Sequence, residues 1–176
     1  MKEKILLVDG YNMIAFWQET RQLFKKSELD AARTILLEKL SHYASFEGIR
    51  VICVFDAQYM PGIRQTYEEF QVQVVFTAED ETADDYIERL AAEFNTPLHQ
   101  VSVATSDLNE QWTVFAQGAL RVSARELEKR VAVVKADLNQ ARGAVNDQKP
   151  PIRPFDQEGL RQLQKEMGAS KWPLKF

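Results

Sequence analysis

The sequence predicts an α/β fold: a three-layer sandwich with a central, mostly parallel five-stranded sheet, followed by a C-terminal helical extension. Two features predict it. The apolar runs are short and continuous, as in strands that are buried on both faces of a parallel sheet. They alternate with longer segments whose apolar residues recur at helical spacing. Strands that alternate with helices in this way are joined by right-handed crossovers, which build a parallel sheet with helices on both faces.

Five segments have the composition of buried strands. Each is a short apolar run with polar residues or glycine at its ends, which is typical of a strand covered on both faces. Gly10 breaks the first of them. The expected strands are residues 4–9, 50–56, 72–77, 101–104 and 119–122.

The segments between and after these strands have helical signals. Ser27, Thr82 and Ser123 each precede an acid by three residues, which is a helix-start pattern, and glycine or proline stops the apolar spacing. The expected helices run from the Ser27 start to the Gly48 stop, from Thr82 to before Pro97, over residues 108–117, from Ser123 to about Arg142, and over residues 156–168. Residues 143–155 contain three prolines and are expected to form a linker.

Length and composition exclude several classes of protein. The chain of 176 residues is sufficient for one domain and a modest appendage. No apolar run approaches the ~20 residues of a membrane helix, so we expect a cytoplasmic protein with no membrane partner. A monomer is a separate expectation. Cys53 lies inside an apolar run, where packing is the expected role. Two histidines and one cysteine are too few for a zinc site, so any metal must be held by oxygen.

Charge is distributed unevenly along the chain. The net charge is −4, but residues 51–110 contain two basic and twelve acidic residues, whereas residues 111–176 have a net charge of +5. A block of acids is most often a solvated surface. It indicates a functional site only if the acids converge.

The predicted topology makes several acids converge. Asp9, Asp56 and Asp107 follow strands, and Asp84 and Asp85 lie in the first turn of a predicted helix. Ligands of an open α/β sheet bind beyond the carboxyl ends of its strands. Crowded carboxylates repel one another unless a cation neutralises them, and oxygen ligands suit Mg²⁺ or Mn²⁺. Each acid alone could instead serve as a helix cap, a dipole partner or a turn former.

Other phosphate chemistries of α/β folds lack their motifs. No Gly-x-Gly-x-x-Gly follows the first strand, and the chain contains no Gly-x-x-x-x-Gly-Lys-Ser/Thr. Asp9 is followed two residues later by Tyr11 and not by the second aspartate of an aspartyl-phosphate phosphatase. The sequence therefore disfavours a dinucleotide-binding protein, a P-loop protein and a phosphatase that forms an aspartyl-phosphate intermediate.

Three motifs in order carry a family resemblance. Val8-Asp9-Gly10-Tyr11-Asn12 closes the first strand, Thr82-Ala83-Asp84-Asp85 opens a helix, and Thr105-Ser106-Asp107 follows the fourth strand. Together they resemble the NYN group of PIN-like metal-dependent ribonucleases. The residues from Asp107 to Phe115, with Gly118-Ala119 and Ser123-Ala124-Arg125-Glu126, resemble the YacP-like subgroup of bacterial proteins, which includes a ribosome-dependent messenger-RNA endonuclease.

The resemblance implies a division of the chain and a set of site residues. It implies a nuclease domain over residues 1–142, with a linker and helical tail over 143–176. Asp9, Asp84 and Asp107 correspond to the family's metal-binding acids, with Asp85 beside them, and Asn12 corresponds to its conserved asparagine. The implied cofactor is Mg²⁺ or Mn²⁺. Asp56 has no assigned role.

An acidic protein that binds RNA needs local cations. Lys25, Lys26 and Arg64 are the candidates, although each could equally be a solvated surface residue. Tyr11, beside the predicted site, could stack on a base or pack in the core. The resulting hypothesis is an endoribonuclease acting on mRNA at the translating ribosome. The alternative is a non-catalytic RNA- or ribosome-binding module on the same fold.

Overall fold

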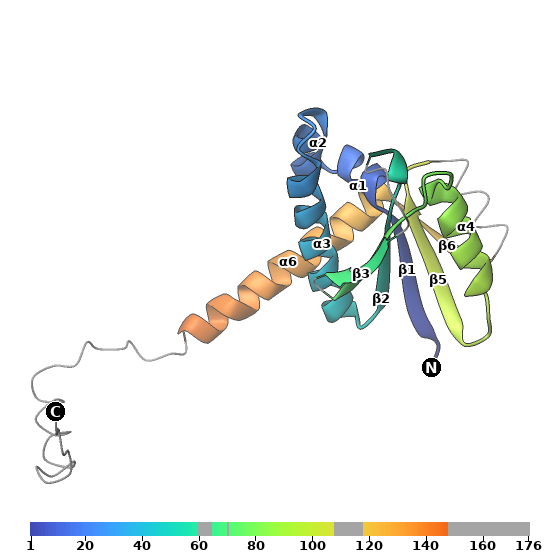
Figure 1. Ribbon diagram of the computed structural model, residues 1–176. Helices are drawn as coiled ribbons and strands as arrows, with labels where there is room; N and C mark the ends of the chain where they lie inside the picture. The colour runs from blue at the N-terminus through green and yellow to red at the C-terminus, as the bar shows by residue number, and fades with distance from the viewer. Residues whose placement is uncertain (60–64, 70, 108–117, 148–176) are drawn as a thin grey trace, which may run out of the picture. The chain divides into compact units, whose positions relative to one another are not determined.

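The structure is a computed structural model, and it describes residues 1–59, 65–69, 71–107 and 118–147. Strands and helices alternate through most of this part of the chain (Figure 1). The elements are β1 (Glu3–Asp9), α1 (Gly10–Phe16), α2 (Gln18–Lys25), α3 (Leu29–Glu47), β2 (Arg50–Phe55), η1 (Ala57–Tyr59), β3 (Gln65–Glu69), β4 (Val72–Phe76), α4 (Ala83–Glu93), β5 (His99–Thr105), β6 (Leu120–Ser123) and α6 (Ala124–Asp147).

One sheet organises the fold, and it confirms the predicted class. Its strand order is β3-β4-β2-β1-β5-β6, and the five strands from β4 to β6 are parallel. These five are the predicted strands. The sixth strand, β3, pairs antiparallel with β4 at the sheet edge and was not predicted. Its sequence, Gln-Thr-Tyr-Glu-Glu, is too polar for an apolar-run signal, as is common for an edge strand.

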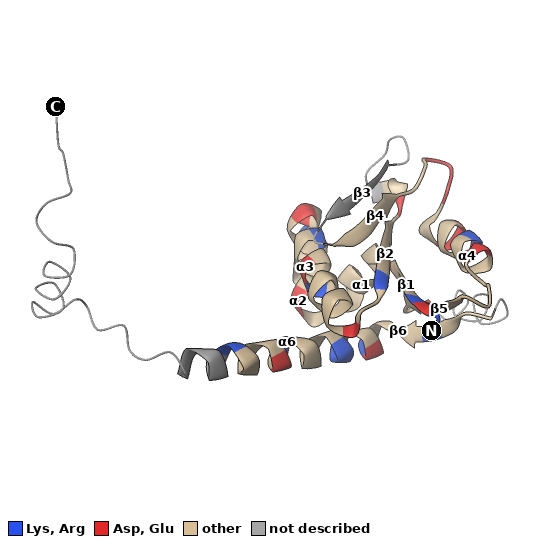
Figure 2. Ribbon diagram, turned by 90° about the horizontal axis from the view of Figure 1, so that it is seen from below, with Lys and Arg blue, Asp and Glu red and all other residues tan. Residues whose placement is uncertain are grey.

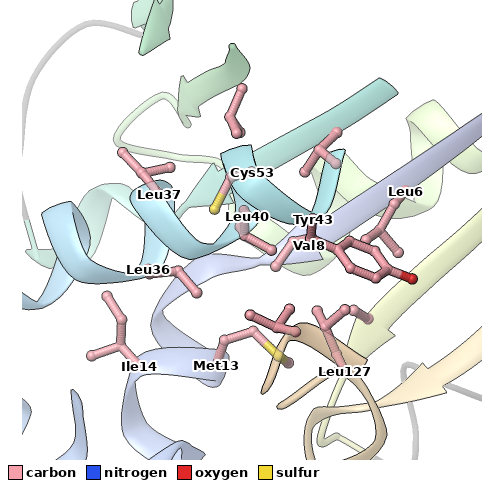
Figure 3. Close-up of a cluster of buried hydrophobic side chains, with 14 of the residues drawn as sticks. Leu6, Val8, Met13, Ile14, Leu36, Leu37, Leu40, Tyr43, Cys53 and Leu127 are labelled. Atoms are coloured by element: carbon pink, nitrogen blue, oxygen red, sulfur yellow. The ribbon is translucent and has the colours of Figure 1, made fainter. Parts of the chain in front are cut away.

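Alternation along the strands divides the core between two faces of the sheet. One face packs under α1, α3 and α6, and Figure 3 shows this cluster, with Leu6 and Val8 of β1 beside Leu36 and Leu40 of α3 and Leu127 of α6. On the other face, neighbouring strand residues such as Leu7 pack against α4. Because helices cover both faces of the sheet, the central strands have continuous apolar sequences. These apolar runs are why the strands could be predicted.

Helices α1 and α2 were not predicted. Each is short, and together they connect β1 to α3. The junction between them is fixed by Trp17, which is 1% exposed and donates its indole Nε1–H to the backbone oxygen of Ala124, 3.0 Å away. The backbone N–H of Gln18 donates to the Glu128 carboxylate at 2.8 Å. These contacts are made with α6, more than 100 residues away, so local sequence does not reveal them.

Most helix boundaries followed the sequence signals, including the stop at Gly48, and two departed from them. Thr82 and Ser123 cap α4 and α6 as predicted. Ser27 does not cap α3: it has φ 61°, and Glu28 precedes the helix without a side-chain cap. Helix α6 continues to Asp147, past the expected end near Arg142, because an isolated glycine such as Gly143 costs a helix only ~1 kcal/mol.

Some predictions fall outside the described residues. They are the helices over 108–117 and 156–168 and the loop at Pro61 and Gly62. The chain divides into two compact units, Met1–Leu138 and Asn139–Phe176, and the whole sheet lies in the first. In the described part of the chain, no helix is both long enough and apolar enough to cross a membrane.

Gly10 is required where β1 turns into α1. A Cβ atom placed on Gly10 would overlap the aromatic ring of Phe55, the last residue of the neighbouring strand. The Phe55 ring also contacts Tyr11, with ring centroids 5.0 Å apart, and stacks on Phe76 at 5.4 Å. The absence of a side chain at Gly10 therefore lets this aromatic cluster close directly under the end of β1.

We predict that Gly10→Ala destabilises the protein by ~1–3 kcal/mol, the usual cost of overpacking a tight core. Guanidinium unfolding of wild type and Gly10→Ala measures this loss of stability. Phe55→Leu removes the ring, so Gly10→Ala should cost less when it is made in a Phe55→Leu background. An equal cost in both backgrounds would show that Phe55 is not the residue that excludes a side chain at Gly10.

Candidate functional site

Asp9 is a buried carboxylate at the carboxyl end of β1. It is 8% exposed, and one of its oxygens accepts the backbone N–H of Asn12 at 3.2 Å, which caps α1. Burial raises the pKa of Asp9 from 3.8 to about 7, the Asn12 hydrogen bond opposes this increase, and the charges of Asp84, Asp56 and Asp107 add to it. A buried acid at the end of a strand is thus surrounded by three further acids.

The three neighbouring acids come from different elements. Asp56 follows β2, Asp107 follows β5, and Asp84 lies in the first turn of α4. The parallel strands β1, β2 and β5 end at the same edge of the sheet (Figure 1), and Figure 2 shows acidic residues in the segment that leads into α4 and on α4 itself. The segments that carry these acids therefore meet at one edge of the sheet, where the charges of Asp84 and Asp107 raise the pKa of Asp9.

Asp84 and Asp85 are both exposed in the first turn of α4. The backbone N–H of Asp85 donates to the Thr82 hydroxyl at 3.1 Å. The acid that raises the pKa of Asp9 from this turn is Asp84. Of the two neighbouring acids, Asp84 is the one that interacts with Asp9.

Asp56 has both carboxylate oxygens bound to backbone N–H groups. Oδ1 accepts from Gln58 at 2.8 Å, and Oδ2 accepts from Ala83, the first residue of α4, at 3.2 Å. The carboxylate therefore connects the end of β2 to the beginning of the helix that carries Asp84. The sequence placed Asp56 at the correct edge but offered no role for it.

Asn12 connects α1 to the segment that carries Asp107. Its side-chain oxygen accepts the backbone N–H of Ser106 at 2.7 Å and also accepts from the Ser106 hydroxyl. The backbone N–H of Asp107 donates to the Thr105 hydroxyl at 3.0 Å. The side-chain oxygen of Asn12 thus holds Ser106, the residue before Asp107, and we had not expected this contact.

The acids suit a hard cation in their chemistry. All are oxygen donors, and a buried carboxylate among like charges is the kind of group that a divalent ion stabilises. Within the described residues, however, no three histidine, cysteine, aspartate or glutamate side chains are close enough to bind one ion together. The oxygen donors fit Mg²⁺ or Mn²⁺ in their chemistry. A bound ion would have to bring three of these side chains together.

Tyr11 packs in the core, the second of the two roles considered for it. The residue is 5% exposed, its ring contacts Phe55, and its hydroxyl accepts from Arg33 at 2.8 Å. Arg33 also pairs with Asp30 and lies 5.7 Å from the centre of the Phe76 ring. This burial leaves no open ring face on Tyr11 for a base.

Two of the candidate RNA contacts lie on the exterior of the protein. Lys25 ends α2 and Lys26 follows it, and both are exposed. Helix α2 lies at the end of the sheet toward which the parallel strands run (Figure 1). Arg64 lies outside the described residues.

Sequence reasoning missed the residues that hold the acids in place. Ser106 lies inside the Thr105-Ser106-Asp107 motif, which was the one available signal for it. Thr77 accepts the backbone N–H of Ala57 at 3.0 Å, and Arg33 anchors Tyr11. These contacts join residues 20 or more positions apart, and no local pattern predicts such pairs.

We predict that Asp9 makes the metal-free protein less stable as pH rises. Its pKa is higher in the folded protein than in the unfolded chain, so the folded state binds the proton more tightly. Stability therefore falls between pH values near 3.8 and about 7, by ~4 kcal/mol, and then levels off. Asp9→Asn should remove this fall and be more stable than wild type near pH ~8.

Guanidinium unfolding across this pH range, with a chelator present, provides the measurement. Asp137→Asn, at an exposed position of α6, is the control for loss of one negative charge. Equal pH dependence in wild type and Asp9→Asn would contradict the prediction.

Comparison with known proteins agrees with the fold and the motifs. A profile of the YacP-like NYN domain matches residues 6–167. The chain is 44% identical over 146 residues to the protein named uncharacterized protein YacP from Bacillus subtilis strain 168, across 83% of this chain and 85% of that protein.

Two crystal structures of Rae1 (YacP) from Bacillus subtilis are also similar, each with 42% identity. One, of a point mutant, has a TM-score of 0.74 and covers 84% of this chain and 86% of its own. The other has a TM-score of 0.73 and covers 93% and 89%. The resemblance drawn from the motifs is confirmed: the fold is that of a PIN-like nuclease, and the chain belongs to the YacP-like NYN domain family.

Proposed function

We propose that this chain is a metal-dependent endoribonuclease that cleaves mRNA in association with the translating ribosome. The observation that supports catalysis most directly is the placement of Asp9, a buried acid surrounded by Asp56, Asp84 and Asp107 on the fold of a nuclease family. A fold alone does not specify an activity, so the proposal depends on these acids.

In this proposal Asp9, Asp84 and Asp107 hold Mg²⁺ or Mn²⁺, with Asp85 as a further donor. The bound ion supplies an acidified water and charge stabilisation for phosphodiester hydrolysis. The chain's own part is to hold its acids at one edge of the sheet. Asp9 has to lose its proton before its carboxylate can act as a ligand. Asn12, fixed by Ser106, orients the Asp107 segment, and the acids serve as ligands and not as nucleophiles.

We predict that Asp84→Asn abolishes most Mg²⁺-dependent cleavage, whereas Asp85→Asn is milder. Loss of a direct ligand should exceed the ~10–100-fold that residues supporting a ligand typically cost. The measurement is the cleavage rate of a message during translation at fixed Mg²⁺, with unfolding midpoints as the control for folding. An equal loss of cleavage rate in the two variants would contradict the prediction that Asp84 contributes more than Asp85.

Two observations favour a second candidate, a non-catalytic RNA- or ribosome-binding module. The described side chains do not form a ready group of three metal ligands, and burial raises the pKa of Asp9 to about 7. Such an edge could simply remain metal-free. Wild-type protein that binds RNA or ribosomes, yet cuts no message with Mg²⁺ either as naked RNA or during translation, would establish this second function.

Charge supports the ribosomal context. The net charge of −4, with −10 over residues 51–110, gives the protein little long-range attraction for a polyanion. A ribosome that already holds the message would supply effective concentration instead. The C-terminal segment 111–176, with a net charge of +5, is the proposed contact with ribosomal RNA.

We predict that the protein cuts a translated message much faster than the same message as naked RNA at matched Mg²⁺. Weak attraction for free RNA at physiological salt is the physical reason. Parallel reactions with one message, with and without translation, give the comparison. Equal rates would exclude ribosome dependence and leave a general endoribonuclease.

The remaining expectations about partners are also proposals. Lys25, Lys26 and Arg64 would guide the RNA backbone to the acidic edge, because phosphate contacts supply affinity with little sequence information. A monomeric state and a cytoplasmic location belong to the same proposal.

A further inference from the structure

We infer that Asp56 is a positioning residue that sets the place of Asp84 by holding the first turn of α4 against the end of β2. The inference deepens the proposed function, on which it rests, because Asp84 is a proposed metal ligand. It also gives a role to the one acid of the group that the sequence left unassigned.

The position of Asp56 is itself fixed by its neighbours. The backbone N–H of Ala57 donates to the Thr77 hydroxyl at 3.0 Å, and the Thr77 N–H donates to the backbone oxygen of Phe55 at 3.0 Å. The Gln58 N–H then closes a tight turn onto Asp56 Oδ1 at 2.8 Å. Hydrogen bonds on both sides thus anchor the Asp56 backbone to the sheet, and its carboxylate has a defined orientation.

The other carboxylate oxygen reaches the beginning of α4. The first N–H groups of a helix have no partner within the helix, and the N–H of Ala83 is one of them. Asp56 Oδ2 accepts it at 3.2 Å across a sequence separation of 27 residues. A carboxylate at a helix N-terminus also interacts favourably with the helix dipole.

Two caps therefore act on α4, and they do different things. Thr82 accepts from Asp85, three residues away, so it determines where the helix begins along the chain. Asp56 belongs to another element, so it determines where that beginning lies relative to the sheet. Asp84 immediately follows Ala83, and its distance from Asp9 depends on this second cap.

The same contacts suit a positioning role for Asp56. Each of its oxygens accepts a backbone N–H, and losing either bond would leave a helix or turn donor without its partner. Residues that orient metal ligands usually make such hydrogen bonds. Asp56 acts through Asp84.

A double-mutant cycle tests the inference. Mn²⁺ binding to the full-length protein is measured for wild type, Asp56→Ala, Asp84→Asn and the double variant. We expect Asp56→Ala to weaken Mn²⁺ binding about tenfold without changing the number of ions bound. In the Asp84→Asn background the same change should have little further effect, because Asp56 acts through Asp84. Full tenfold weakening in both backgrounds would overturn the inference and identify Asp56 as a ligand or as a general source of charge.

A second measurement does not need metal. Amide hydrogen exchange of the metal-free protein should become faster at Ala83 in Asp56→Ala. In the control variant, Thr82→Ala, the faster amide should be that of Asp85. If Asp56→Ala fails to fold, Asp56→Asn, which keeps the shape of the side chain, replaces it in both experiments. Unchanged exchange at Ala83 would overturn the inference whatever the metal results.

The outcomes separate this inference from the proposed function. If wild type binds no Mn²⁺ or cuts no RNA, the proposed function fails, while exchange at Ala83 still decides whether Asp56 holds α4. If wild type binds Mn²⁺ and cuts RNA but Asp56→Ala changes neither Mn²⁺ binding nor exchange, the proposed function stands and the inference fails.

Discussion

The burial of one carboxylate among like charges is the constraint on which the rest of this structure depends. Asp9 ends a central strand and is 8% exposed, and three other acids add to the cost of ionising it. A shift of the pKa from 3.8 to about 7 corresponds to ~4 kcal/mol, more than a single hydrogen bond to a charged group returns. The surrounding core has to supply the difference, since both faces of the sheet are packed right up to its carboxyl edge.

The chain keeps the acids at this edge through backbone hydrogen bonds. Asp9 caps α1, Asp56 binds the first N–H of α4, and Asn12 holds Ser106 beside Asp107. Each bond joins an acid, or the segment that carries one, to a different element. These bonds keep the segments that carry the acids at one edge of the sheet, where the charges of the other acids raise the pKa of Asp9. A proton on Asp9 relieves this repulsion at low pH, and a divalent cation would relieve it at neutral pH.

Much of this arrangement could be predicted, for identifiable reasons. The strands β1, β2 and β4 are buried along most of their length, so their apolar runs are visible in the sequence, and Thr82 has a local capping signal. The polar edge strand β3 and the short helices α1 and α2 lack such periodic signals. The positions of the acids followed from topology. Their supports did not, because the Asp56–Ala83 and Asn12–Ser106 bonds span 27 and 94 residues.

The most direct test of a buried acid that exchanges a proton for a cation is to count protons during metal binding. Calorimetric titration of Mn²⁺ at about pH 6.5, in buffers of different ionisation enthalpy, gives this number. Because the pKa of Asp9 is about 7, we expect between about one half and one proton released per ion by wild type, and close to none by Asp9→Asn. Metal binding by wild type without proton release, or with the same release in Asp9→Asn, would contradict the central role given to Asp9.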